Sequence, residues 1–190
     1  ATLYQCKMSW DRCCLMPRCA LLLLTLAGAG VCATRVPIFV TTADGNEGFA
    51  MVMGLLPSAD VLVVAGVSDA NSTAAQELMK AGAEVRVVTQ PPSPEVFRGC
   101  AWAFILAPLT ADRLQVGQHL INAAAAAGVV YAALLSVIGD PATAPPSLDA
   151  YFQLESHLAS VWRPGRSVTL RTYFYQQNLL LWSRDVQETG

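Results

Sequence analysis

The chain has 190 residues, of which 54% are hydrophobic and only 14% charged, a composition that excludes a disordered or highly charged protein. Its length suits one substantial core. The net charge of −2 divides into +2 over the first 33 residues and −4 over the rest, where no run of Lys and Arg occurs, so nucleic acid is not the expected partner.

Residues 1–33 have the pattern of a targeting segment. Arg12 and Arg18 precede an apolar run over 19–31, which ends at small residues up to Ala33. A positive start, a short apolar stretch and small residues at a cleavage position are typical of a secretory signal peptide. The alternative is an uncleaved anchor, although a membrane span needs about 20 apolar residues. We predict a secretory-pathway or plastid destination, with membrane contact only through this segment if it stays uncleaved.

Cysteines and histidines do not form a ligand pattern. Five cysteines lie in the first 33 residues and Cys100 stands alone in the remainder, without a partner pair at zinc spacing, so we predict no metal site. Cys100 precedes an apolar strand and is predicted to be a small core residue. His119 and His157 fall on different predicted helices, and we expect both to be partly exposed helix residues.

From residue 34 to residue 190 the sequence predicts one domain in which strands and helices alternate. The expected strands are 38–41, 61–65, 85–88, 102–106, 129–136 and 167–171. The expected helices begin near 46, span 74–79 behind a Ser72 or Thr73 cap, run from about 111 to 127, cover 151–162, and end the chain with 174–182. Repeated β–α units with short connections predict a Rossmann-type doubly wound parallel sheet of about six strands, with helices on both faces.

The first strand leads into the turn Thr42-Ala43-Asp44-Gly45-Asn46-Glu47-Gly48. A strand that passes through glycines into a helix N-terminus offers unpaired backbone N–H groups and a partial positive charge to a phosphate. Two features oppose this. Thr42 stands where a G-x-x-G-x-x-G turn has its first glycine, and Asp44 brings a negative charge beside the expected phosphates.

Several segments in order, from about Val36 to Leu181, are similar to a known family. They are the turn 42–48, the segments 74–85, 117–124 and 135–139, and Leu170-Arg171-Thr172-Tyr173-Phe174-Tyr175-Gln176-Gln177-Asn178-Leu179-Leu180, which resembles an L-R-P-x-x-F-x-x-N-L stretch. The chain resembles the NmrA-like group of atypical short-chain dehydrogenases/reductases. That resemblance implies a Rossmann fold that binds NAD or NADP, and a C-terminal substrate region that is missing or truncated in this sequence. The implied cofactor-binding residues are Thr41, Thr42, Gly45, Asn46, Glu47, Gly48, Ser68 and Asp69.

The position after the second strand bears on the choice of cofactor. Members that prefer NADP carry an Arg there, whereas this chain has Ser68 followed by Asp69. A carboxylate at this place accepts hydrogen bonds from an unphosphorylated ribose and repels a 2′-phosphate, so NAD is slightly preferred. Two alternatives stay open: Asp69 caps a turn of its own loop, or no cofactor is bound.

Ser136 and Tyr151 stand where short-chain dehydrogenases carry their catalytic Ser and Tyr. In those enzymes a Lys four residues after the Tyr lies on the same helix face and lowers the pKa of the phenol. Here Glu155 occupies that position, and a carboxylate acts in the opposite direction. The resemblance therefore implies an NAD(P)-binding protein that is catalytically weak or inactive, acting as a cofactor-sensing or scaffold subunit.

Two other functions compete with this one. The first is an active NAD(P)-dependent oxidoreductase on a small carbonyl or quinone, with Ser136 and Tyr151 at its centre. The second is a purely structural subunit of a larger complex, whose tryptophans Trp102, Trp162 and Trp182 are buried against protein partners or in an ordinary core.

Overall fold

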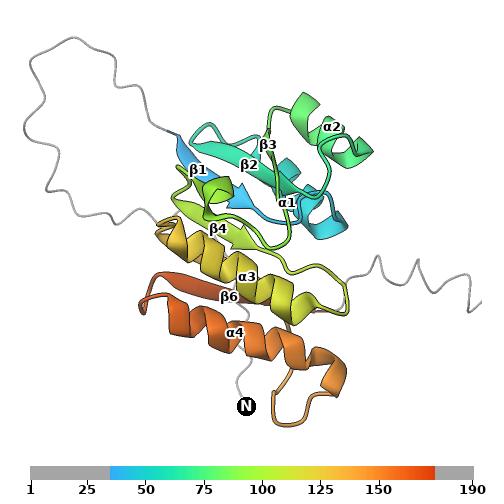
Figure 1. Cartoon of the computed structure of the whole chain (residues 1–190), viewed down its shortest axis with the longest axis vertical. Helices are drawn as coiled ribbons and strands as arrows, with labels where there is room; N and C mark the ends of the chain where they lie inside the picture. Colours follow the sequence, from blue (N-terminus) through green and yellow to red (C-terminus); the bar gives the residue numbers. More distant parts are fainter. Residues whose placement is uncertain (1–34, 174–190) are drawn as a thin grey trace, which may run out of the picture. The chain divides into compact units, whose positions relative to one another are not determined.

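The computed structural model describes residues 35–173, and the targeting segment 1–33 and the predicted helix 174–182 lie outside them. Six parallel strands form one sheet in the order β3-β2-β1-β4-β5-β6 (Figure 1). The strands are β1 (Val36–Val40), β2 (Val61–Val67), β3 (Glu84–Val87), β4 (Trp102–Ile105), β5 (Tyr131–Val137) and β6 (Ser167–Thr172). The described part of the chain begins with β1 in the middle of the sheet, runs to the β3 edge, returns beside β1 at β4 and proceeds to the β6 edge. This is the doubly wound Rossmann order.

Four α-helices connect the strands: α1 (Asn46–Leu55), α2 (Thr73–Lys80), α3 (Arg113–Ala126) and α4 (Asp149–Val161). Their ends follow local signals. The Ser72 side chain accepts a hydrogen bond from the Ala75 amide at the start of α2, as predicted. Gly82 and Gly128 follow α2 and α3 with φ of 103° and 80°, a conformation that glycine adopts without strain.

The sheet separates two cores, because side chains on a strand alternate between faces. Val40 packs with Val52 of α1 and Leu78 of α2. Its neighbour Phe39 packs on the opposite face with residues of α3 and α4. Helices therefore cover both faces, as predicted. In Figure 1, α3 and α4 lie side by side across one face, and Gly117 allows this close approach, since a Cβ there would lie 2.7 Å from the Leu154 side chain.

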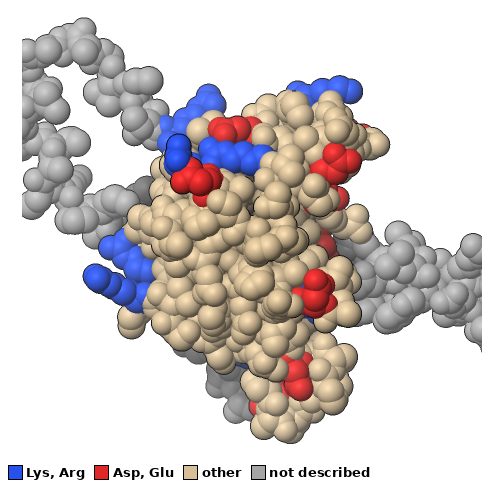
Figure 2. Space-filling view, in the orientation of Figure 1, with Lys and Arg blue, Asp and Glu red and all other residues tan. Residues whose placement is uncertain are grey.

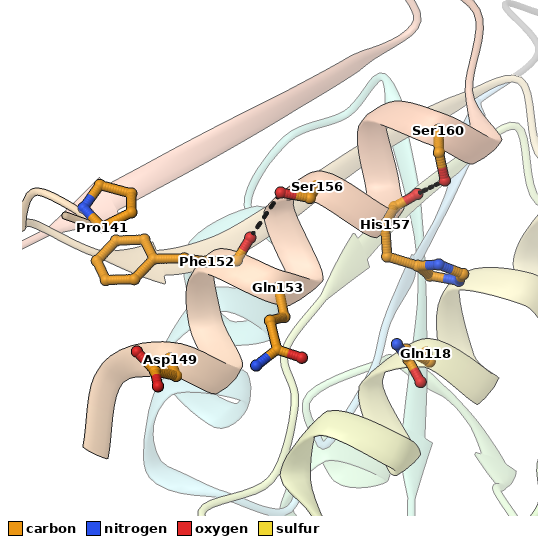
Figure 3. A pocket seen from close by; sticks show the side chains of 8 residues that line it. All are labelled: Gln118, Pro141, Asp149, Phe152, Gln153, Ser156, His157 and Ser160. Atoms are coloured by element: carbon orange, nitrogen blue, oxygen red, sulfur yellow. Dashed lines mark hydrogen bonds between the residues drawn. The ribbon is translucent and has the colours of Figure 1, made fainter. Parts of the chain in front are cut away.

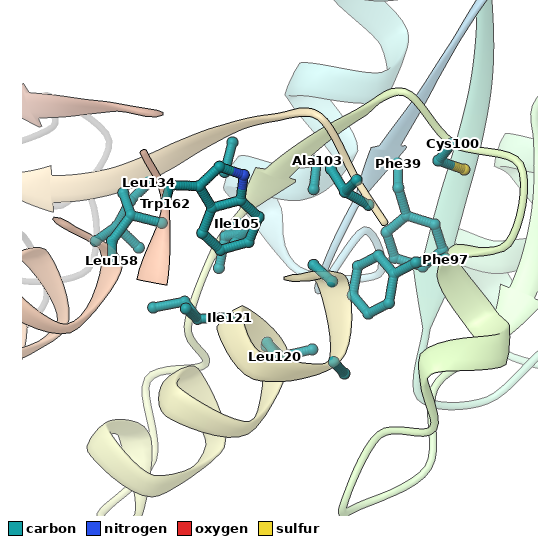
Figure 4. Packing of buried hydrophobic residues seen from close by; sticks show 14 of the residues in the cluster. Phe39, Phe97, Cys100, Ala103, Ile105, Leu120, Ile121, Leu134, Leu158 and Trp162 are labelled. Atoms are coloured by element: carbon teal, nitrogen blue, oxygen red, sulfur yellow. The ribbon is translucent and has the colours of Figure 1, made fainter. Parts of the chain in front are cut away.

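The larger core contains Cys100, which the sequence predicted to be a core residue, and Trp162, one of the tryptophans whose surroundings were left open. Cys100 is buried in this core, close to Phe39 and Phe97, whose ring centroids are 4.4 Å apart (Figure 4). Burial raises the pKa of the Cys100 thiol, as expected of a small core residue. Trp162 belongs to the same core, whereas Trp102 is 39% exposed and stacks on Tyr131.

The structure differs from the sequence-based expectation mainly in proline-rich connections. The connections between β3 and β4 and between β5 and α4, for which the sequence predicted neither strand nor helix, contain two short 3₁₀-helices, η2 (Pro94–Phe97) and η3 (Pro146–Leu148). Proline fixes φ near the helical value and has no N–H to lose, which favours a single turn at these places. Within residues 35–173, no helix is both long enough and apolar enough to cross a membrane.

Candidate functional site

The turn after β1 is tied to the end of the neighbouring strand β4. The Thr41 hydroxyl is buried and both accepts from the Leu106 amide, at 2.7 Å, and donates to the Leu106 carbonyl, at 2.9 Å. The Thr42 hydroxyl donates to the same carbonyl at 2.8 Å. The buried Thr41 therefore fixes the turn to the segment after β4. Thr42 is the first residue of the turn that is partly exposed.

Thr42 has a backbone conformation that glycine adopts more easily than other residues. Its φ is +50°, in the left-handed region that β-branched residues rarely adopt. The hydrogen bond to Leu106 directs its side chain toward β4. The turn thus retains a glycine-like path with a side chain added to it, and residues in such strained conformations concentrate at ligand sites.

Helix α1 begins directly against this turn. Gly45 precedes the first helical residue in an extended conformation and has no side chain that could cap the first amides of α1. Gly48 is buried, and a Cβ on it would lie 2.1 Å from the Thr42 carbonyl oxygen. The glycine is required because helix and turn are in backbone contact. The first amides of α1 are thereby placed at the carboxyl edge of the sheet, where an anion would be attracted.

A crevice of about 350 Å³ opens at this edge. Its floor and walls come from the turn, from the segment after β4, and from the ends of β5 and β6. It contains seven of the residues singled out from the sequence: Thr42, Gly45, Asn46, Glu47, Gly48, Ser136 and Tyr151. In open parallel sheets ligands bind outside the carboxyl ends of the strands, where the strand order reverses, here between β1 and β4.

Asp44, Ser68 and Asp69 are not among the residues that line the crevice; Asp44 meets Ser68, the residue before Asp69, at the carboxyl end of β2. The Asp44 carboxylate is hydrogen-bonded to Ser68, which donates its backbone N–H at 2.7 Å and its hydroxyl at 2.5 Å. Asp69 accepts the Asn71 amide at 2.8 Å within its own loop. The negative charge of Asp44, which was expected beside the phosphates, is therefore directed toward the end of β2.

Ser136 and Glu155 form one network with Arg171 of β6. The buried Ser136 hydroxyl donates to Glu155 Oε1 at 2.5 Å. Arg171 binds the same carboxylate through Nε at 2.9 Å and Nη2 at 2.6 Å. Burial alone would raise the pKa of Glu155, but the hydrogen bonds from Arg171 and Ser136 and the Arg171 charge hold the pKa below its usual value. Glu155 is therefore a charge-paired carboxylate bound to Ser136.

Tyr151 has a different cation beside it. The Arg113 guanidinium carbon lies 4.4 Å from the centre of the Tyr151 ring, and Arg113 Nε donates to the Pro108 carbonyl at 3.0 Å. A cation over an aromatic face stabilises the side-chain arrangement. Neither Arg113 nor Arg171 was predicted from the sequence to be a site residue. Arg171 is opposite Ser136 in the β5–β6 register, a relationship visible only once the strand pairing is known.

A second, wider depression of about 570 Å³ lies on the outer side of α3 and α4 (Figure 3). Its two serines are bound within α4: Ser156 donates to the Phe152 carbonyl, and Ser160 to the His157 carbonyl. His157 Nε2 lies 2.9 Å from Asn122 Oδ1. His119 and His157, which were expected to be partly exposed on helices, are both half-buried. The face of α3 and α4 carries few charges (Figure 2). The crevice at the carboxyl edge is the better candidate site, because the start of α1, which no side chain caps, lines it.

Comparison of the sequence with protein-family models and with curated proteins finds no match. Solved structures do match. An NADPH-dependent quinone oxidoreductase from Escherichia coli, complexed with NADPH, is 26% identical over 80% of this chain and 54% of its own, with a TM-score of 0.67. NmrA, a negative transcriptional regulator solved with NADP, is 21% identical over 74% and 45%, with a TM-score of 0.60. A nucleoside-diphosphate-sugar epimerase from Staphylococcus aureus is 16% identical over 81% and 56%, with a TM-score of 0.70.

The sheet order, the glycine turn and the crevice define a Rossmann-type α/β domain. The fold is that of the NmrA-like atypical short-chain dehydrogenases/reductases, which confirms the resemblance predicted from the sequence. The quinone oxidoreductase was solved with NADPH, and NmrA with NADP and also with NAD, which are the cofactors expected from the sequence. The chain spans about half the length of these structures.

Proposed function

We propose that this chain binds NAD or NADP in the crevice at the carboxyl edge of the sheet and acts as a cofactor-sensing or scaffold subunit with weak or no dehydrogenase chemistry. The observation that carries the proposal is the combination of a formed crevice at the strand-order reversal with a carboxylate, Glu155, fixed where the catalytic cation of the family would lie.

The phosphate end of the crevice fits a dinucleotide. The amides of Asn46 and Glu47 open α1 at the surface of the turn without a capping side chain, whereas the Gly45 amide donates to the Thr42 carbonyl at 3.1 Å. A pyrophosphate there would receive hydrogen bonds from these amides and the favourable end of the helix dipole. Thr42 and Glu47 also line the crevice, so a phosphate would share the site with one hydroxyl-bearing and one acidic residue.

The proton-transfer end does not fit the short-chain dehydrogenase reaction. That reaction needs a Ser hydroxyl directed at the substrate and a cation that lowers the phenol pKa. Here the Ser136 hydroxyl donates to Glu155, and Arg171 neutralises that carboxylate. The Ser136 hydroxyl and the Arg171 cation are thus both bound to Glu155.

Binding is tested by titrating the purified full chain with NADH and NADPH and measuring nicotinamide fluorescence and the thermal unfolding midpoint. A ligand that binds only the native state raises that midpoint. Gly45→Asp places a carboxylate at the phosphate position and should abolish binding, whereas the matched change Gly54→Asp, at an exposed position of α1 with open space around it, should leave binding intact. No binding of either nucleotide at millimolar concentration would contradict the proposal and favour a purely structural subunit.

An active NAD(P)-dependent oxidoreductase on a small carbonyl or quinone is the second candidate. It is favoured by the presence of both Ser136 and Tyr151 in the lining of the crevice and by the Arg113 cation against the Tyr151 ring. This candidate predicts measurable turnover of a quinone with NADH or NADPH that Tyr151→Phe abolishes. Turnover that is unchanged in Tyr151→Phe would exclude the phenol from the reaction.

A further inference from the structure

The Asp44 carboxylate bridges two loops that are far apart in the sequence. Asp44 lies in the turn after β1, and Ser68 is the residue that follows β2. One carboxylate oxygen of Asp44 accepts both the backbone N–H and the hydroxyl of Ser68, at 2.7 and 2.5 Å. Two hydrogen bonds on one oxygen fix the position of the negative charge at the carboxyl end of β2.

In a Rossmann fold, the group about 20 residues after the glycine turn decides how the adenosine ribose is read. A carboxylate there accepts from the 2′-hydroxyl of NAD, and an arginine accommodates the 2′-phosphate of NADP. In this chain neither the turn at 41–48 nor the segment 66–72 contains Lys or Arg. The charges in these two segments are all negative: Asp44, Glu47 and Asp69.

Of the two aspartates beside Ser68, Asp44 is the better placed to read the ribose. Asp69 uses its carboxylate to accept the amide of Asn71 and so belongs to the turn of its own loop. Asp44 instead comes from the phosphate-binding turn itself and reaches the end of β2. A carboxylate can accept about four hydrogen bonds, so a ribose hydroxyl can donate to Asp44 without displacing Ser68.

We infer that Asp44, held by Ser68, makes the crevice select NAD over NADP. The inference rests on the proposed dinucleotide binding. The carboxylate accepts a 2′-hydroxyl and repels a 2′-phosphate, and two like charges in a partly desolvated site change affinity by on the order of tenfold. The selecting charge therefore comes from the first turn, whereas the sequence pattern pointed to Ser68 and Asp69 after the second strand.

The test measures dissociation constants of the full chain for NADH, NADPH, ADP-ribose and 2′-phospho-ADP-ribose by calorimetry. The last two lack the nicotinamide and so remove the contribution of that ring from the comparison. We expect both unphosphorylated ligands to bind at least about tenfold more tightly than their 2′-phosphorylated counterparts. Asp44→Asn keeps an oxygen that accepts from Ser68 and removes the charge, so affinity for the 2′-phosphorylated ligands should rise several-fold while NADH affinity stays within about threefold.

Asp69→Asn is the matched control, because it removes a charge of the same sign one residue away from Ser68. It should leave the ratio of the two affinities unchanged. Equal affinity of the unaltered chain for NADH and NADPH, or a ratio that responds to Asp69→Asn and not to Asp44→Asn, would overturn the inference while leaving dinucleotide binding in place. Failure of all four ligands to bind would instead overturn the proposed function. If a variant does not fold, equal affinities of the unaltered chain for the two kinds of ligand would still overturn the inference.

Discussion

Arg171 binds Glu155 through two nitrogens, Nε at 2.9 Å and Nη2 at 2.6 Å, and so joins the last strand of the sheet to α4. The Glu155 side chain is 13% exposed, and Ser136 donates to it from the neighbouring strand. A two-point pair between a carboxylate and a guanidinium is among the stronger hydrogen-bonding arrangements in proteins. Glu155 follows Tyr151 by four residues, so this ion pair occupies the position at which the reaction of the family would need an unpaired cation.

Glu155→Gln should lower the free energy of unfolding by about 1–2 kcal/mol at pH 7, because it weakens charge-assisted hydrogen bonds to a mostly buried group. The pKa of Glu155 is lowered in the folded protein, so its stabilising contribution is full above the unfolded value of about 4.3 and is lost as the pH falls through the folded pKa. Urea unfolding of both proteins from pH 7 to pH 3 measures this. A difference that stays constant down to pH 3 would contradict the assignment.

Glu155→Lys recreates the Tyr-x-x-x-Lys spacing but places a second cation against Arg171. We expect a loss of about 2–4 kcal/mol in unfolding free energy, since Ser136 also loses its acceptor. The double variant Glu155→Lys with Arg171→Glu should recover part of this loss, by about 1–3 kcal/mol, because the pair is restored with reversed charges. Chemical denaturation of the two single variants and the double variant closes the cycle. Strictly additive losses would show that the two side chains are not coupled.

Thr42→Gly should increase dinucleotide affinity by about threefold or more, since a glycine lets the backbone of the turn approach a pyrophosphate more closely. Stability should change little. Relief of the left-handed strain at Thr42, about 1–2 kcal/mol, offsets the lost hydrogen bond to Leu106 and the added freedom of the unfolded chain. The control is Thr42→Ala, which keeps a Cβ in the strained conformation. It should lose stability without gaining affinity, and equal affinity gains in both variants would refute the role of the Cβ.

Gly48→Ala and Gly54→Ala make the same change on one helix in two environments. At Gly48 a Cβ would lie 2.1 Å from a backbone oxygen, so the turn and α1 must separate, and we expect a loss of about 2–4 kcal/mol. At Gly54 a Cβ meets nothing within 4 Å, and alanine should stabilise the helix by about 0.5–1 kcal/mol. Thermal unfolding compares the two directly. A Gly48→Ala protein as stable as the original would mean that helix and turn are not in contact.

The elements with local signals were predictable from the sequence. The apolar run that begins at Val61 forms β2, Ser72 caps α2 and Gly128 follows the end of α3, because each depends on residues close along the chain. The alternation of these elements, with short connections, was enough to predict a parallel, doubly wound sheet. The glycine turn was likewise visible, because its spacing is contained in seven residues.

The chemistry of the crevice was decided by contacts between distant segments. Three pairs of residues that meet in the structure are far apart in the sequence: Thr42 and Leu106 by 64 positions, Asp44 and Ser68 by 24, and Ser136 and Arg171 by 35. Each pair meets only because particular strands are neighbours in the sheet. The sequence by itself determined that a Rossmann domain forms with a glycine turn at its centre. Only the tertiary structure decided where its carboxylates lie and which groups neutralise them, since hydrogen bonds act over about 3 Å and strand register, not chain position, sets which residues come that close.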